Sequence, residues 1–325
     1  MIGSGFNDIQ LGGKECIRWQ LVFWCTQKHL VCDVMLVTVA LCTFNVENYI
    51  SDCLKALLNQ TFSDFEIVIV DDSTDSTGEI VQTFNDRRIR YFKNRRRLGL
   101  SKSRNECIKS STGKYVFFTD ADCVVSRDWI QQGLKSFSNS SCVGVEGKTY
   151  YVSEKYVPTF SDSVIENKHG GQFMCCNIAY EKKVLEEVGG FDERYHYYFE
   201  DRDLALRVKK LGKIEFNPRM IVYHRKVIMT PKHFIRRAER VRGRVLLFKR
   251  FQDRRFGRIP DPMWHILHPL DLMTAVCPPL IFSLLGIYNF RNKEDWILLP
   301  YAWMKKVRER LNIWDTCARE KIFLV

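Results

Sequence analysis

Residues 115–123 read Tyr-Val-Phe-Phe-Thr-Asp-Ala-Asp-Cys, and this stretch decides the fold. An apolar run that ends in polar residues is typical of a central strand buried on both faces of a parallel sheet. Ligands of such sheets bind beyond the carboxyl ends of the strands. Asp120 and Asp122 stand at that end, where two hard oxygen donors can share a divalent cation that neutralises a diphosphate. The alternative is a polar turn that merely ends the strand.

The composition indicates a sizeable core and an anionic partner. The chain has 325 residues, 46% of them hydrophobic, which is enough for one large or two small domains. Its net charge of +12 favours nucleotide phosphates, anionic lipid or nucleic acid as partners. Its 12 cysteines show no Cys-x-x-Cys spacing. This argues against a zinc site or a disulfide scaffold and indicates reduced thiols in the cytosol.

Strands and helices alternate in the pattern upstream of this stretch. Apolar runs predict strands over residues 34–42, 65–70, 89–92 and 115–119, and helical periodicity predicts helices over residues 50–58, 78–84 and 101–110. Such alternation predicts right-handed βαβ units and a mainly parallel sheet flanked by helices, an α/β fold. The second half is less regular, with a strand at 143–151, helices at 182–188 and 201–211, and two short strands at 214–216 and 220–223 around Pro218.

We expect three parts: an N-terminal extension (1–33), the α/β domain (34–230) and a basic and apolar helical region (231–325). We expect no signal peptide, because the first residues lack a basic start, an apolar run and a cleavage site. Residues 232–258 are rich in arginine, and residues 272–290 contain no charge. A basic belt beside an apolar segment favours an anionic membrane surface, with residues 263–290 as the segment that would enter it. The alternative is a buried helical pair in a soluble domain.

Eight short blocks in this chain resemble, in the same order, those of glycosyltransferase family 2 with the GT-A (Rossmann-like) fold. They span about residues 35–226 and are Cys42–Asn45, Leu58–Phe62, Val70–Thr77, Leu98–Asn105, Thr119–Asp122, Gly189–Asp192, Phe199–Leu204 and Tyr223–His224. The resemblance implies a metal-dependent, inverting transfer from a nucleotide-diphospho-sugar to an acceptor hydroxyl or phosphate.

On the nucleotide side, the resemblance places Thr43 and Glu47 in the pocket after the first strand. Asp71 would accept a hydrogen bond from an N–H of the base. Asp72 is the alternative for that contact, or it serves the structure of the turn. Lys102 would approach the base or the phosphates.

The resemblance assigns the metal to the end of the 115–119 strand. Asp122 would ligate Mg²⁺ or Mn²⁺, and Asp120 would contact the ribose or the metal. His224 would contact the metal or the diphosphate, and a structural histidine is the alternative. Arg104 is a candidate phosphate contact, although a structural role is the favoured interpretation.

On the acceptor side, the resemblance makes Asp201 the general base that takes the proton of the acceptor hydroxyl. Glu200 and Asp203 are adjacent carboxylates, and like charges can raise the pKa of one of them. The alternative is that they cap the helix that starts there. Asp192 would hold the acceptor-side loop. Asn177 would lie near the donor sugar, and the preceding Cys176 departs from the family's usual small residue, so the sugar stays open.

Residues 234–243 lack the Gln-x-x-Arg-Trp block of processive synthases, which favours transfer of one sugar. Their arginines either bind a diphosphate or acceptor phosphate, or form a solvated face. A glycan or polyprenyl-linked acceptor at the cytoplasmic face of the membrane follows as the expected partner, in glycan or cell-surface polysaccharide biosynthesis.

Two other functions compete with this interpretation. A nucleotidyltransferase would need a Gly-rich phosphate loop after the first strand, and residues 42–48 have none. A non-catalytic nucleic-acid or membrane-binding protein would suit the basic charge. It does not explain acidic residues at strand ends, so no nucleic acid is expected.

Overall fold

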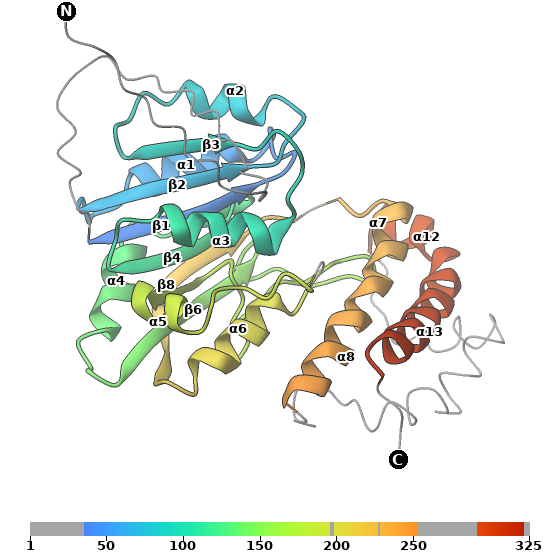
Figure 1. Cartoon of the computed structure of the whole chain (residues 1–325). Coiled ribbons are helices and arrows are strands. Elements are labelled where there is room, and N and C mark those ends of the chain that lie inside the picture. The colour runs from blue at the N-terminus through green and yellow to red at the C-terminus, as the bar shows by residue number, and fades with distance from the viewer. Residues whose placement is uncertain (1–35, 196–197, 227, 252–290, 322–325) are drawn as a thin grey trace, which may run out of the picture. The chain divides into compact units, whose positions relative to one another are not determined.

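The structure is a computed structural model that describes residues 36–195, 198–226, 228–251 and 291–321 (Figure 1). The predicted extension (1–33) and the predicted apolar segment (263–290) lie outside these residues. The division of the chain into 1–33, 34–230 and 231–325 stays a prediction.

The predicted alternation in the first half is confirmed. Four strands lie side by side and parallel in the order β3 (Ile89–Lys93), β2 (Phe65–Asp71), β1 (Val37–Thr43) and β4 (Tyr115–Asp120). The helices between them are α1 (Ile50–Leu58), α2 (Thr77–Gln82) and α3 (Leu100–Ser110). Every residue of β2 is buried, as a strand covered on both faces requires.

The second half extends the sheet beyond β4 with β7 (Ile178–Glu181), β6 (Cys142–Tyr151), β8 (Lys213–His224) and β5 (Cys123–Val125). The whole sheet is mixed: β1 to β4 pair in parallel, as predicted, and β6 and β8 add one more parallel pair. Among the described strands the antiparallel pairs are confined to this half, between β4 and β7, β6 and β7, and β5 and β8. The helices here are α4 (Trp129–Ser136), α5 (Lys182–Glu187) and α6 (Glu200–Val208).

The prediction of two short strands around Pro218 is wrong, because residues 213–224 form the single strand β8. Opposite Gly147 and Lys148 of β6, the register of β8 jumps from Asn217 to Ile221. Proline has no N–H for the ladder, so the strand accommodates it as an irregularity instead of ending.

Two apolar clusters cover the two faces of the sheet and fix the end of β4. Phe117 points to one face and packs edge-on against Trp129 of α4, with ring centroids 5.2 Å apart. Phe118 points to the other face, where its ring lies 5.5 Å from that of Phe191. Packing of Phe117 and Phe118 on opposite faces fixes the position of β4, and so fixes where Asp120 and Asp122 emerge from the core.

The C-terminal region is helical, as predicted, in the residues that are described. It contains α7 (Pro231–Arg236), a 3₁₀ turn (Arg237–Glu239), α8 (Arg240–Phe251), α12 (Lys293–Leu298) and α13 (Tyr301–Arg319). Helices α8 and α13 lie side by side (Figure 1), joined by ion pairs between Arg242 and Asp315 and between Lys249 and Glu320. Within the described ranges, no helix has the length and apolar character needed to span a bilayer.

Candidate functional site

The carboxyl ends of β1, β2 and β4 bring the predicted nucleotide-side residues to one edge of the sheet. Thr43 lies opposite Asp71, and Cys42 lies opposite Asp120 in the parallel register. The Thr43 hydroxyl donates to Oδ1 of Asp71 over 2.7 Å. Thr43, Asp71 and Asp120 therefore lie at the same edge of the sheet.

Asp71 is fully buried, and the protein already satisfies its carboxylate. It also accepts from the Tyr91 hydroxyl (2.6 Å), Lys93 Nζ (2.8 Å) and the Ser73 backbone N–H (2.8 Å). Burial alone would raise the pKa of Asp71, but the hydrogen bonds from Lys93, Ser73, Tyr91 and Thr43 outweigh it and lower the pKa to about 2. Asp71 is therefore an ionised acceptor at neutral pH. Its contact with a base stays a prediction.

Asp72 organises the turn that leads into α3. It accepts from Asn94 Nδ2 (2.7 Å), from the backbone N–H groups of Leu98 (3.1 Å) and Gly99 (2.9 Å), and from the Ser103 hydroxyl (3.2 Å). This is the structural role considered for Asp72 in the sequence.

The two remaining nucleotide-side candidates lie on the surface. Glu47 accepts from the backbone N–H of Ser76 over 3.1 Å and so ties the segment before α1 to the start of α2. Lys102 is exposed on α3, and its ammonium group lies 3.5 Å from Glu193. The structure pairs neither of them with Asp71, and their roles stay predictions.

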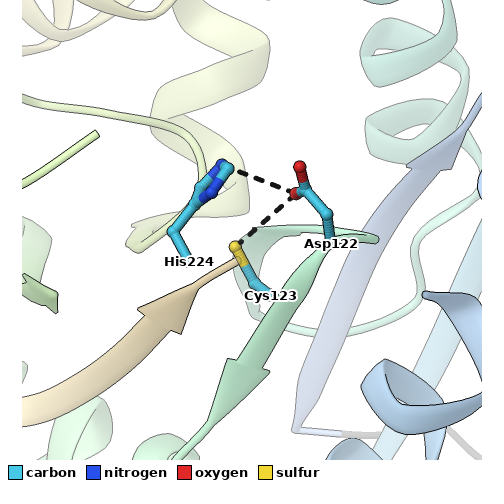
Figure 2. Close-up of side chains that lie close together, drawn as sticks. All are labelled: Asp122, Cys123 and His224. Carbon is cyan, nitrogen blue, oxygen red and sulfur yellow. Dashed lines mark hydrogen bonds and ion pairs between the residues drawn. The ribbon is translucent and has the colours of Figure 1, made fainter. Parts of the chain in front are cut away.

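Asp122 and His224, the two predicted metal ligands, are brought together (Figure 2). His224 Nε2 lies 3.5 Å from Asp122 Oδ1, and Sγ of Cys123 lies 3.9 Å from the same oxygen. The His224 Nδ1 lies 2.9 Å from the Arg225 carbonyl oxygen. A carbonyl can only accept, so Nδ1 is the nitrogen that donates to it, and Nε2 is the nitrogen that faces Asp122. Imidazole nitrogen and carboxylate oxygen are both common metal ligands, so this pair is a candidate metal site.

Asp120 belongs to a different network, centred on Arg104. The buried Arg104 guanidinium donates through Nη2 to Asp120 (3.2 Å) and through Nη1 to Glu200 (2.7 Å). It thus joins the end of β4 to the start of α6. This contact pattern matches the structural interpretation of Arg104.

Asp201 stands in the first turn of α6, after two residues with left-handed backbone, Tyr198 (φ 62°) and Phe199 (φ 73°). Burial and the charge of the adjacent Glu200 raise the pKa of Asp201 to about 7, against the opposing effect of Arg104. A carboxyl that titrates near neutral pH is suited to general-base work. Burial is the larger cause of the rise, and the like charge of Glu200 adds to it.

Asp192 ties the loop before α6 to the C-terminal helix α8. Arg194 and Arg250 both donate to it, with Arg250 Nη2 2.6 Å away. Hydrogen bonds from Arg194, with a further one from Arg250, hold the pKa of Asp192 far below its usual range despite burial. Arg250 also pairs with the fully buried Asp203 of α6.

The amide of Asn177 is engaged by the protein itself. Its Oδ1 accepts from Trp129 Nε1 over 2.8 Å, and its Nδ2 donates to the carbonyls of Lys148 (2.9 Å) and Met220 (3.0 Å). Asn177 therefore holds α4, β6 and β8 together, and its proximity to a donor sugar stays a prediction.

Sequence reasoning missed three residues of this region. Tyr91 and Lys93 are two apart on β3, and the period of a strand places them on one face, a signal that could have been used. Cys123 directly follows Asp122 and faces His224 across a strand pair. Nothing in the sequence pointed to that pairing.

Comparisons with known proteins agree with this geometry. The model of the family "Glycosyl transferase family 2" matches residues 38–228. The chain is 29% identical over 206 residues to glycosyltransferase GlyA of Streptococcus pneumoniae, covering 60% of this chain and 29% of that protein. It is 30% identical over 184 residues to the Escherichia coli protein named UDP-Glc:alpha-D-GlcNAc-diphosphoundecaprenol beta-1,3-glucosyltransferase WfaP, covering 55% and 71%.

Two solved structures share the fold. Staphylococcus aureus TarS 1–349 in complex with UDP-GlcNAc has a TM-score of 0.53 at 18% identity, over 88% of this chain and 92% of that one. The mannosyltransferase PcManGT of Pyrobaculum calidifontis, in complex with GDP-Man and Mn²⁺, has a TM-score of 0.55 at 16% identity, over 88% and 87%.

Proposed function

The chain belongs to glycosyl transferase family 2, and on that premise we propose that it transfers one glycosyl unit, with inversion, from a nucleotide-diphospho-sugar to an acceptor. One observation carries the proposal: the buried Arg104 joins Asp120, beside the Asp122–His224 pair, to Glu200, beside Asp201. This bridge supports a single site in which the donor-side and acceptor-side carboxylates would act together.

The donor side would hold a divalent cation between Asp122 and His224, with Mg²⁺ or Mn²⁺ as the ions implied by the resemblance. Such an ion would neutralise the diphosphate as it leaves. The Mn²⁺ and GDP-Man of the PcManGT complex and the UDP-GlcNAc of the TarS complex support this assignment. Thr43 and Asp71 would orient the nucleotide.

The acceptor side would use Asp201 as the base. As the acceptor oxygen attacks the anomeric carbon and the bond to the diphosphate breaks, the hydroxyl proton passes to Asp201. Direct attack from the face opposite the leaving group inverts the anomeric configuration. With a pKa near 7, Asp201 is a strong enough base to assist and is still largely ionised at slightly alkaline pH.

A cluster of arginines beside Asp201 supports a phosphorylated acceptor. The Arg240 guanidinium lies 4.5 Å from the ring centroid of Tyr198, and that of Arg244 lies 5.8 Å from that of Phe199. Both aromatic residues directly precede α6. Among the described residues, no acidic side chain forms an ion pair with Arg237, Arg240 or Arg244, although the charge of Glu309 acts on Arg237 and Arg244.

These cations repel one another where they are partly buried. Burial and the charge of Arg240 lower the pKa values of both Arg237 and Arg244. An anion would relieve the repulsion. We therefore propose a lipid-linked diphosphate acceptor at an anionic, cytoplasmic membrane face, and the diphosphoundecaprenol in the name of WfaP supports it.

A thermal-shift screen of UDP-, GDP- and dTDP-sugars, with and without Mn²⁺, tests the donor site. A ligand at about 100 times its Kd stabilises the folded state by about 2.7 kcal/mol. We expect a shift with one nucleotide that requires the metal and disappears in Asp122→Ala. A folded protein that shifts with no donor but binds DNA in a salt-sensitive manner would replace this proposal with the nucleic-acid-binding one.

A further inference from the structure

Cys123 and His224 are direct partners across the antiparallel pair β5 and β8. Residues opposite each other in such a pair point to the same face of the sheet. Asp122 precedes Cys123 and turns its carboxylate towards both side chains (Figure 2). One ligand atom from each residue, a carboxylate oxygen, a thiol sulfur and an imidazole nitrogen, lies within 4.8 Å of the other two.

The spacing of these atoms fits one small cation. Ligands about 2.0–2.3 Å from a tetrahedral metal lie roughly 3.3–3.8 Å from one another. The measured separations from Asp122 Oδ1 are 3.5 Å to His224 Nε2 and 3.9 Å to Cys123 Sγ. Three protein ligands would leave a fourth position open, as in catalytic zinc sites.

The sulfur changes which metals the site prefers. Mg²⁺ requires oxygen ligands in near-octahedral geometry and keeps much of its water. Thiolate and imidazole favour softer ions. Cys123 and His224 are 1% and 3% exposed, so both ligand side chains are almost completely shielded from water.

We propose that Cys123 is a ligand of this centre, which therefore binds Zn²⁺ or Co²⁺ in preference to Mg²⁺. This inference rests on the metal site of the proposed function and specifies its chemistry. On binding, the thiol releases its proton to solvent and the sulfur forms a bond to the metal, with no change of oxidation state.

The competing role for Cys123 is that of a buried apolar residue. It packs in the same apolar cluster as Val222 and Cys176. Burial and Cys176 raise the pKa of the Cys123 thiol, so a metal must displace its proton. A purely structural thiol would not contact an added metal, and this difference can be measured.

Cobalt titration of the full, metal-free chain gives that measurement, because Co²⁺ reports its ligands in its absorption spectrum. We expect visible bands of a four-coordinate site and a near-ultraviolet sulfur-to-cobalt charge-transfer band. Cys123→Ser should abolish the charge-transfer band and weaken Zn²⁺ and Co²⁺ binding at least about tenfold. Mg²⁺ binding should stay within about twofold, because Mg²⁺ gains little from sulfur.

Cys107→Ser is the matched control, since it changes a buried thiol of the other apolar cluster, and it should retain the charge-transfer band. All other cysteines are common to the three proteins, so difference spectra cancel their contribution. Circular dichroism and melting temperature verify folding. Cys123→Ala serves as the second variant if the serine variant is unfolded.

The outcomes separate this inference from the proposed function. Cobalt binding that depends on Asp122 but shows no charge-transfer band from Cys123 overturns the sulfur ligand and leaves the metal site standing. Absence of any Asp122-dependent metal binding overturns both.

Discussion

Replacing Asp201 with asparagine should stabilise the protein while it destroys activity. The pKa of this carboxyl is raised from 3.8 to about 7, which corresponds to about 4 kcal/mol against the ionised form. Because Asp201 is only partly shielded from solvent, we expect Asp201→Asn to raise the free energy of unfolding by about 2–4 kcal/mol. Asparagine keeps the shape and cannot ionise.

The sign follows from proton linkage. Between the unfolded pKa and the raised folded pKa, the folded state binds more protons than the unfolded state, so stability falls as pH rises. The wild type thus loses this stability progressively from about pH 4 to pH 7, whereas Asp201→Asn does not. The difference in unfolding free energy between Asp201→Asn and wild type should reach its full value at pH 8 and roughly a third of that value at pH 5.

Urea unfolding at pH 5 and pH 8, together with a transfer assay, tests the reasoning. We expect kcat of Asp201→Asn to fall about 10²–10⁴-fold. The wild-type kcat/KM should decline below about pH 7, where the base becomes protonated.

Asp203→Asn is the matched control on the same helix. Asp203 forms an ion pair with Arg207 at 2.8 Å, so Asp203→Asn should lower the free energy of unfolding. Equal stability of Asp201→Asn and wild type at pH 8 would refute the raised pKa, and a variant that keeps full transfer would refute the base assignment.

Three further predictions concern the frame of the site. Arg104→Met should destabilise by about 3–5 kcal/mol in urea unfolding, since it leaves buried Glu200 without its cation; a loss below about 1 kcal/mol would contradict the bridge. Gly190→Ala should lower Tm more than Gly189→Ala, because both have positive φ but only at Gly190 would a Cβ meet Asn105, at 2.6 Å; equal losses would show that backbone strain alone acts. Arg250→Gln should increase proteolysis or hydrogen exchange of α8, which it pins to Asp192; unchanged exchange would argue against that tether.

Much of the fold could be predicted from local patterns. Apolar runs located β1, β2 and β4 because a strand buried on both faces needs apolar residues throughout. The pattern failed at Pro218, where it indicated two strands. Whether a proline ends a strand depends on its partner, and β6 continues alongside.

In the candidate site, too, local sequence patterns predicted some features, and others depend on tertiary contacts. Which carboxylates stand at strand ends, and that Glu200 and Asp201 carry adjacent like charges, could be read from neighbouring residues. Which distant groups meet these carboxylates depends on how the chain folds. Arg104 and Glu200 are 96 residues apart, and Cys123 and His224 meet only because β5 pairs with β8. Ion pairing, ligand geometry and a raised pKa depend on distances of a few ångströms through space, and these are set by how strands pair and helices pack.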